Sequence, residues 1–160
     1  CRLVRRAIER AERRDVRIVV NDRADVALAA RAHGVHLRAD SVPVAGVKHL
    51  SSHWLVGRSV HVGSPGEPDA DYLLFGTVYG TSSKPGITPA GLAALKGLAS
   101  SVTQPVLAIG GITPDRAAEC RRAGATGIAA IGAFLPEGTE PGALGVAVAV
   151  RAFRAALGGR

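Results

Sequence analysis

The chain has 160 residues, of which 47% are hydrophobic and 4% aromatic, and its formal net charge is +7. This length and apolar content predict one domain, spanning residues 1–160, with a buried core rather than a disordered tail. The densest basic segment, residues 2–14, interleaves arginines with aliphatic residues and contains no aromatic residue. We interpret it as an amphipathic helix and expect no nucleic-acid partner, because no ring is present there to stack on bases.

Cysteine usage and hydropathy narrow the class of protein further. Cys1 and Cys120 do not make a disulfide framework, and no cysteine or histidine cluster has zinc spacing. Cys120 lies in an expected helix, and we interpret it as an inert core thiol. No apolar run reaches the roughly 18 residues of a membrane span, and the first residues are too charged for a signal peptide. We therefore expect a cytoplasmic protein with no membrane partner.

Short β-rich runs alternate with Ala- and Leu-rich amphipathic stretches along the chain. The predicted strands are residues 17–20, 35–37, 54–57, 72–75, 106–109 and 127–131. The predicted helices that follow the basic segment are residues 23–33 (closed by Gly34), 42–50, 89–100, 114–123 and 143–157. Continuous apolar strands that alternate with helices indicate parallel βαβ units. This periodicity fits a closed barrel and a doubly wound sheet equally, although no Gly-x-Gly-x-x-Gly follows the first strand, which argues against dinucleotide binding.

Local signals mark several helix ends. Thr113 and Pro114 are an expected N-cap and first helical residue, and Thr88 with the following proline repeats the pattern. Gly124 stands where a left-handed residue commonly ends a helix. Asp22 precedes the helix at 23–33, and its spacing favours a capping role over a functional one.

Glycine-bearing turns follow two late strands, at the carboxyl ends where parallel sheets bind ligands. Gly110 and Gly111 lie between a strand and a helix N-terminus, and Ile131 and Gly132 lie in the equivalent turn of the next strand. Backbone N–H groups in such turns suit a phosphate dianion. One turn alone would be interpreted as a tight connection, but the pair favours a phosphate site.

Three other groups of polar residues follow strands. The loop at 77–86 carries Thr81, Ser83 and Lys84, whose hydroxyl and ammonium groups suit a second anion or a closing lid. Asp22 and Asp40 together offer two carboxylates for a magnesium-type cation. His61 ends a strand beside Arg58 and Ser59, where it could move a proton near neutral pH, whereas the other four histidines are interpreted as surface or packing residues.

Six runs in order along the chain resemble the thiamine phosphate synthase/TenI superfamily. They are VNDRADVA (20–27), GVHL (34–37), GRSVH (57–61), DYLLFGTVY (71–79), TSSKPG (81–86) and AIGGITP (108–114). The resemblance implies a TIM (β/α)₈ barrel, of which this chain contains six parallel strands and lacks the first two. It also implies a small phosphorylated thiazole as ligand, with a pyrimidine diphosphate as second substrate for the synthases.

The resemblance implies roles for individual residues. Gly111, Ile131 and Gly132 would hold the thiazole phosphate, and Ser59 and Asp22 would line the pocket. Thr81, Ser83 and Lys84 would face a diphosphate or carboxylate. In a synthase, Asp22 and Asp40 would hold Mg²⁺, whereas a tautomerase would need no cofactor, and its proton would be moved by His61 or Thr77.

Two departures from the family pattern shape the functional prediction. Ser41 stands where synthases carry their second magnesium carboxylate, and Thr77 stands where the TenI-type tautomerase carries a catalytic histidine. The run GRSVH is nonetheless more TenI-like than synthase-like. We therefore predict a thiamine-biosynthesis enzyme that leans to the TenI-type thiazole tautomerase. The alternatives are thiamine phosphate synthase and a non-catalytic binder of thiazole phosphate, each compatible with a homo-oligomer.

Overall fold

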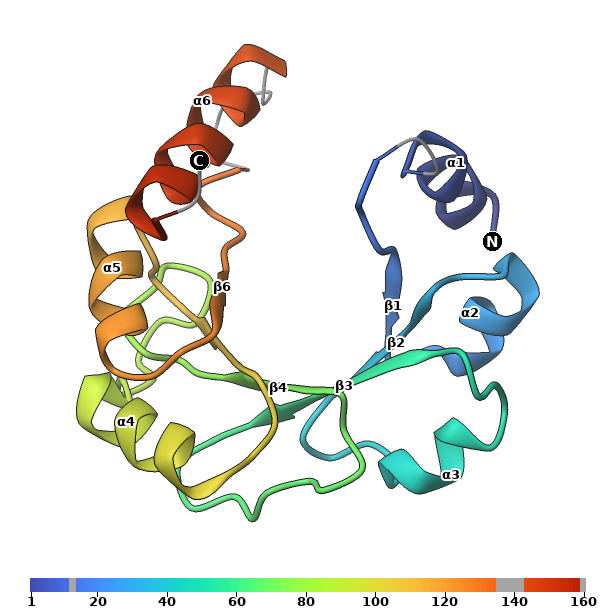
Figure 1. Ribbon diagram of the computed structural model, residues 1–160, viewed down its shortest axis with the longest axis horizontal. Coiled ribbons are helices and arrows are strands. Elements are labelled where there is room, and N and C mark those ends of the chain that lie inside the picture. The colour runs from blue at the N-terminus through green and yellow to red at the C-terminus, as the bar shows by residue number, and fades with distance from the viewer. Residues whose placement is uncertain (12–13, 135–142, 159–160) are drawn as a thin grey trace. The chain divides into compact units, whose positions relative to one another are not determined.

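The structure is a computed structural model that describes residues 1–11, 14–134 and 143–158 (Figure 1). Two compact units divide the chain: Cys1–Val60 with Pro65–Leu73, and His61–Ser64 with Leu74–Arg160. The six strands follow one another in the sheet in chain order. The strand–helix alternation expected from the sequence is therefore confirmed, while the expectation of a single domain remains a prediction.

The first unit begins with a helix and continues as strand–helix repeats. Its elements are α1 (Arg2–Ala11), β1 (Val19–Asn21), α2 (Ala24–Ala30), β2 (Gly34–Leu37), α3 (Val44–Lys48) and β3 (Leu55–Val60). The pairing is parallel, with Val20 opposite Val35 and Val35 opposite Val56. Every residue of β2 is buried, as expected for a parallel strand that is covered on both faces.

The second unit repeats the pattern. The strand β4 (Tyr72–Phe75) enters it, followed by α4 (Gly91–Ser101), β5 (Val106–Ile109), α5 (Pro114–Arg122), β6 (Gly127–Ala129) and α6 (Ala143–Ala156). β5 and β6 are parallel, with Ala108 opposite Ile128. Phe75, Leu95 and Cys120 are at most 1% exposed. Burial raises the pKa of the Cys120 thiol, which agrees with the prediction of an inert core cysteine.

The predicted helix ends were confirmed in part. The Thr113 side chain accepts a hydrogen bond from the Arg116 N–H at 3.4 Å, and Gly124 has a positive φ of 97°. The Thr88 prediction is wrong, because α4 begins at Gly91 after Ala90 and no side chain caps it. Among the described residues, no helix is both long and apolar enough to cross a membrane.

Gly34 does not close α2 as predicted, because the helix ends at Ala30 and Arg31 takes the left-handed conformation. Gly34 instead opens β2, where it lies directly against β3. A Cβ atom on Gly34 would be 1.9 Å from the carbonyl oxygen of Leu55. The glycine is therefore required by the close approach of two backbones rather than by a helix cap.

We predict that Gly34→Ala lowers the free energy of unfolding by about 1–3 kcal/mol, because the added methyl group forces β2 away from β3. Gly97→Ala is the matched control. It lies inside α4 with open space around its Cβ position, and should raise the free energy of unfolding by about 0.5–1 kcal/mol. Urea denaturation of both variants measures the difference, and equal effects would contradict the packing argument.

Candidate functional site

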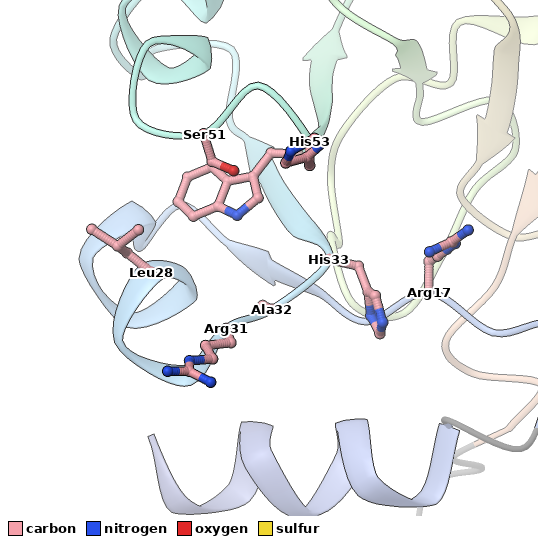
Figure 2. Close-up of a pocket in the computed structure, with 8 residues that line it drawn as sticks. Arg17, Leu28, Arg31, Ala32, His33, Ser51 and His53 are labelled. Atoms are coloured by element: carbon pink, nitrogen blue, oxygen red, sulfur yellow. The ribbon is translucent and has the colours of Figure 1, made fainter.

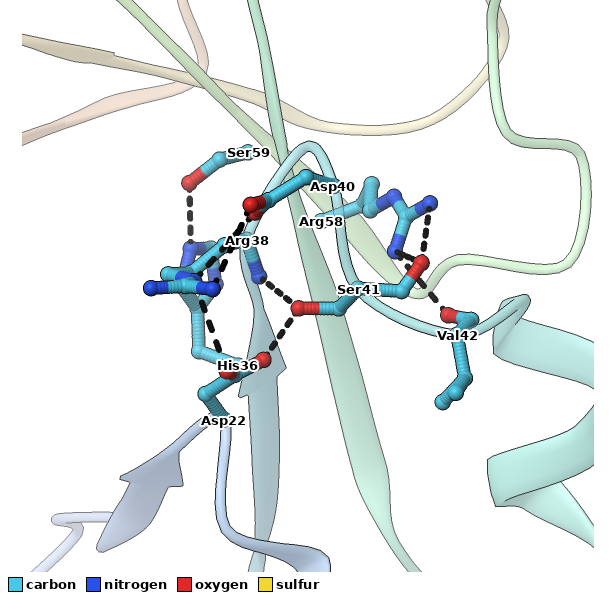
Figure 3. A network of polar contacts seen from close by, with 8 residues as sticks. All are labelled: Asp22, His36, Arg38, Asp40, Ser41, Val42, Arg58 and Ser59. Carbon is cyan, nitrogen blue, oxygen red and sulfur yellow. Dashed lines mark hydrogen bonds and ion pairs between the residues drawn. The ribbon is translucent and has the colours of Figure 1, made fainter.

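The carboxyl ends of the three strands in the first unit bring a polar cluster together (Figure 3). Asp22 follows β1 with a positive φ of 60°, and its N–H donates to the carbonyl of His36 at 2.8 Å. Its carboxylate accepts a hydrogen bond from the Ser41 hydroxyl. The predicted capping role of Asp22 is wrong, because the N-cap of α2 is Arg23 and no side chain bonds there.

Arg38 lies between two carboxylates. Its Nε atom is 3.4 Å from Oδ2 of Asp22 and 3.3 Å from Oδ1 of Asp40. The hydrogen bond from Ser41, followed by the charge of Arg38, lowers the pKa of the Asp22 carboxyl group. Asp22 and Asp40 therefore come together as predicted, and they already surround a positive charge.

Ser41 and Arg58 fix the loop that follows β2. The Ser41 hydroxyl accepts from the Arg38 N–H at 3.0 Å while it donates to Asp22. The Arg58 guanidinium donates to the carbonyls of Ser41 and Val42 at 3.2 and 3.0 Å. Its Nε lies 3.7 Å from the Glu67 carboxylate. Hydrogen bonds between side chains and backbone groups thus hold this loop in place. Ser41 is thereby positioned to orient Asp22.

His36 is a member of this cluster that we assigned to packing or to the surface. Its Nε2 lies 2.8 Å from the Ser59 hydroxyl, and its Nδ1 lies 3.1 Å from the hydroxyl of Tyr72. Burial, reinforced by the charge of Arg58, lowers the pKa of His36. The sequence did offer a sign of this role, because His36 is a polar residue within the otherwise apolar strand β2. His36 thus orients Ser59, one of the predicted ligand-binding residues.

The donor set of the first unit can be tested against a magnesium ion. Magnesium is usually held by one or two carboxylates together with substrate phosphates and water. Asp22 and Asp40 match that pattern, because both carboxylates face one cationic position. Within the described part of the chain, no group of three His, Cys, Asp or Glu side chains could hold a metal. The residues fit magnesium bound with a diphosphate rather than a bare ion.

In the second unit, the turn after β5 lies against the loop after β4. Val78 N–H donates to the carbonyl of Ile109 at 2.9 Å, and Tyr79 N–H donates to that of Gly110 at 3.1 Å. Gly110 and Gly111 both have positive φ, and a Cβ on Gly111 would be 2.3 Å from the carbonyl oxygen of Gly80. Both glycines are therefore needed for this close contact.

A set of side chains from α5 secures the same turn. Arg116 donates to the carbonyl of Gly111 at 2.7 Å, and its guanidinium lies 4.6 Å from the centre of the Tyr79 ring. The Tyr79 hydroxyl donates to Glu119 at 2.5 Å. Burial, followed by this bond, raises the pKa of Tyr79. The carbonyls of Gly110 and Gly111 are occupied by protein donors, so their N–H groups are what the turn can offer to an anion.

The remaining predicted residues lie in loops of the second unit. Thr81 and Ser83 hydroxyls are 3.1 Å apart, and the Lys84 N–H donates to the carbonyl of Thr81 at 3.2 Å. These three residues therefore form one turn. The Thr77 carbonyl accepts from Ala90 at 2.8 Å.

His61 and the turn after β6 are both exposed. Nδ1 of His61 lies 2.6 Å from the carbonyl oxygen of Gly76. Because a carbonyl only accepts, Nδ1 is the donor of this hydrogen bond, and Nε2 is the ring nitrogen that faces away from it. Ile131 is 62% exposed, and a Cβ on Gly132 would meet no atom within 4 Å. Unlike Gly111, Gly132 has no steric reason to be glycine.

We predict that the free energy of unfolding decreases as the pH falls below about 6.5, partly because of His36. The unfolded chain takes up a proton on this residue near its usual pKa of about 6.5, whereas the folded pKa is lower. At a pH above both pKa values of His36, this residue costs the folded state no stability. Below the pKa of the unfolded chain, one histidine lowers the free energy of unfolding by at most about 1.4 kcal/mol for each pH unit. His36→Gln should reduce the slope, and the exposed His53→Gln should not. Identical slopes would refute the assignment.

Comparison with known proteins places this chain in a family. The profile of the thiamine monophosphate synthase family matches residues 1–134. Thiamine-phosphate synthase of Chloroflexus aurantiacus is 42% identical over 128 residues, which are 77% of this chain and 59% of the relative. Putative thiamine-phosphate synthase 2 of Aquifex aeolicus is 38% identical over 122 residues, 74% of this chain and 66% of the relative. The chain thus spans about three fifths of the length of the Chloroflexus protein.

A solved structure supports the same assignment. Thiamine phosphate pyrophosphorylase from Pyrococcus furiosus matches with a TM-score of 0.80 and 32% identity, over 98% of this chain and 75% of that one. The α/β fold of TIM-barrel type expected from the sequence is thereby confirmed. The names of these relatives favour the synthase alternative over the tautomerase that the sequence analysis preferred. The chain belongs to the thiamine monophosphate synthase family.

Proposed function

We propose that this protein is a thiamine-phosphate synthase. It joins a hydroxymethylpyrimidine diphosphate to a thiazole phosphate and releases diphosphate. Relatives about 40% identical that carry this name support the proposal. We prefer this activity to the tautomerase activity that the sequence analysis favoured, mainly on the run at 57–61.

The observation that carries the proposal is the convergence of two carboxylates, Asp22 and Asp40, on the guanidinium of Arg38. The single charge of Arg38 compensates the two carboxylates in this structure, and a Mg²⁺ ion bound with the diphosphate would take the place of that guanidinium. A proton transfer between ring carbons needs no metal, whereas the departure of a diphosphate is helped by one. The pair therefore favours diphosphate chemistry.

The roles of the residues in the first unit follow from their contacts. Asp22 and Asp40 would hold Mg²⁺ together with the diphosphate, and Ser41 would orient Asp22 through its hydroxyl. When bound, magnesium neutralises the charge that develops on the leaving diphosphate. The bond between the pyrimidine methylene carbon and the diphosphate oxygen breaks, with its electron pair leaving on the diphosphate. The thiazole nitrogen then supplies the electron pair of the new C–N bond.

The second unit would bind phosphate groups. The N–H groups of Gly110 and Gly111 and the open turn at Gly132 suit the thiazole phosphate, because α5 directs its N-terminus and dipole to this turn. Thr81, Ser83 and Lys84, which share one turn, would bind a second anionic group. Lys84 is exposed, so its ammonium group is available to neutralise negative charge.

A second candidate is the TenI-type tautomerase, and the hydrogen bond of His61 favours it. Nδ1 of His61 donates to the carbonyl of Gly76, so Nε2 is the ring nitrogen that could accept a proton from a substrate. In that case the reaction moves one proton between ring carbons through His61 or Thr77, and magnesium is not required. Binding of a thiazole phosphate without turnover of either kind would favour the non-catalytic binder.

We predict that Asp22→Asn lowers the magnesium-dependent release of diphosphate at least about tenfold, because one of two carboxylates that would hold the metal is lost. Diphosphate release and thiamine phosphate formation are measured with both substrates, with and without magnesium. Asp25→Asn is the matched control. Its carboxylate is bound by Arg23 at 2.6 Å on α2 and lies outside the cluster. Product formation that is unaffected by magnesium or by Asp22→Asn would refute the metal-binding role of Asp22, and the absence of product from the unsubstituted protein would refute the synthase assignment.

We predict that Gly132→Asp weakens binding of the thiazole phosphate by at least about tenfold, because a carboxylate would face the phosphate dianion. The fold should be retained, since the position has room for a side chain. Gly132→Asn is the control of equal size without charge and should bind more tightly than the aspartate variant. Titration calorimetry measures both, with circular dichroism as the check on folding. If Gly132→Asp and Gly132→Asn bind the thiazole phosphate with equal affinity, the phosphate does not bind at this turn.

A further inference from the structure

Arg38 places a positive charge of the chain itself inside the candidate metal site. It follows β2 directly, and its backbone is held by Ser41. The Ser41 hydroxyl accepts the Arg38 N–H at 3.0 Å, and the Ser41 N–H donates to the Arg38 carbonyl at 3.1 Å. From this fixed backbone the side chain reaches Asp22 and Asp40, and its guanidinium lies between their carboxylates (Figure 3). The position that a cation would take is therefore filled by the protein.

The contacts of this guanidinium are loose. Its Nε is 3.4 Å from Asp22 and 3.3 Å from Asp40, and a terminal nitrogen is 3.3 Å from the other oxygen of Asp40. Hydrogen bonds between a charged nitrogen and a carboxylate are usually about 2.7–2.9 Å long. The side chains of Arg38 and Asp40 are 58% and 74% exposed, and ion pairs that water can reach stabilise a fold little. The guanidinium can therefore leave both carboxylates at small cost.

Arg58 shows how a structural arginine of the same cluster differs from Arg38. The Arg58 side chain is 12% exposed, and it donates to the backbone carbonyls of Ser41 and Val42. Within the described part of the chain, the Arg38 side chain donates to no backbone carbonyl. The geometry of the loop therefore does not depend on the Arg38 guanidinium, and its contact with the two carboxylates needs another explanation.

A divalent cation and this guanidinium compete for the same two carboxylates. A cation that binds alone must displace Arg38 and is repelled by its charge. A cation that arrives with a diphosphate brings phosphate oxygens, which the planar fork of arginine binds well. We propose that Arg38 is an exchangeable counter-ion, which covers Asp22 and Asp40 in the free protein and moves onto the diphosphate when the metal–diphosphate complex binds. This inference rests on the proposed synthase function, and it makes the site selective for the complex over the bare metal.

Arg38→Gln tests the proposal because it should change two affinities in opposite directions. Mn²⁺, a spectroscopic substitute for Mg²⁺, is titrated into the full chain without substrate, and the free ion is measured by electron paramagnetic resonance. The variant should bind Mn²⁺ about threefold more tightly, because the competing charge is gone. Inorganic diphosphate is titrated by calorimetry in the presence of Mg²⁺. The variant should bind it about tenfold more weakly, because a charged hydrogen bond to the phosphate oxygens is lost.

Arg23→Gln is the matched control, because the Arg23 guanidinium is bound to Asp25 at 2.6 Å, outside the cluster. It should leave both affinities unchanged. Adding Asp22→Asn to Arg38→Gln should abolish the tighter binding of Mn²⁺, which would locate that binding at this pair of carboxylates. A Mn²⁺ affinity that Arg38→Gln does not raise, or a diphosphate affinity that it does not lower, would overturn the proposal. Neither measurement needs turnover, so product formation by the unsubstituted protein tests the synthase function separately.

Discussion

Parallel pairing of β1 with β2 and of β2 with β3 decides where the polar groups of the first unit lie. Because all three strands run in one direction, the residues that follow them meet at one edge and the residues that precede them meet at the other. Asp22, Ser41 and Ser59 share the first edge, although as many as 37 positions separate them in sequence. His33 and Trp54 share the second. The buried aliphatic residues of β2 hold both edges in register, so the clusters depend on core packing rather than on local turns.

Charge compensation links the cluster at the carboxyl ends to its proposed chemistry. Arg38 neutralises two carboxylates that would otherwise repel each other, and the Ser41 hydroxyl satisfies an oxygen of Asp22 without adding charge. A family magnesium ligand at position 41 would have given three negative groups around one position. With serine there, the carboxylates alone attract a divalent cation less strongly, and the charge of a bound diphosphate must supply the difference. The proposed synthase activity therefore implies that metal and substrate binding are coupled.

The sequence predicted what depends on local or periodic signals. Strand–helix alternation, the Thr113 cap and the glycine turn at Gly110 and Gly111 follow from patterns within a few residues. The capping interpretation of Asp22 failed because its hydroxyl partner is Ser41, far along the chain, and no spacing rule contains that contact. His36 was missed for the same reason, since its partners Ser59 and Tyr72 come from other strands.

The two edges of the first unit differ in how their arginines are compensated. At the carboxyl edge, Arg38 and Arg58 both lie near carboxylates. At the amino edge, Arg17 and Arg31 have no such partner within the residues described, although the exposed surface could accommodate one. The side chains of Arg17 and Arg31 are both exposed and point away from each other (Figure 2), so water solvates each charge and little repulsion acts between them. The arginines of the carboxyl edge are therefore fixed by the fold around the candidate site, whereas those of the amino edge are solvated surface charges.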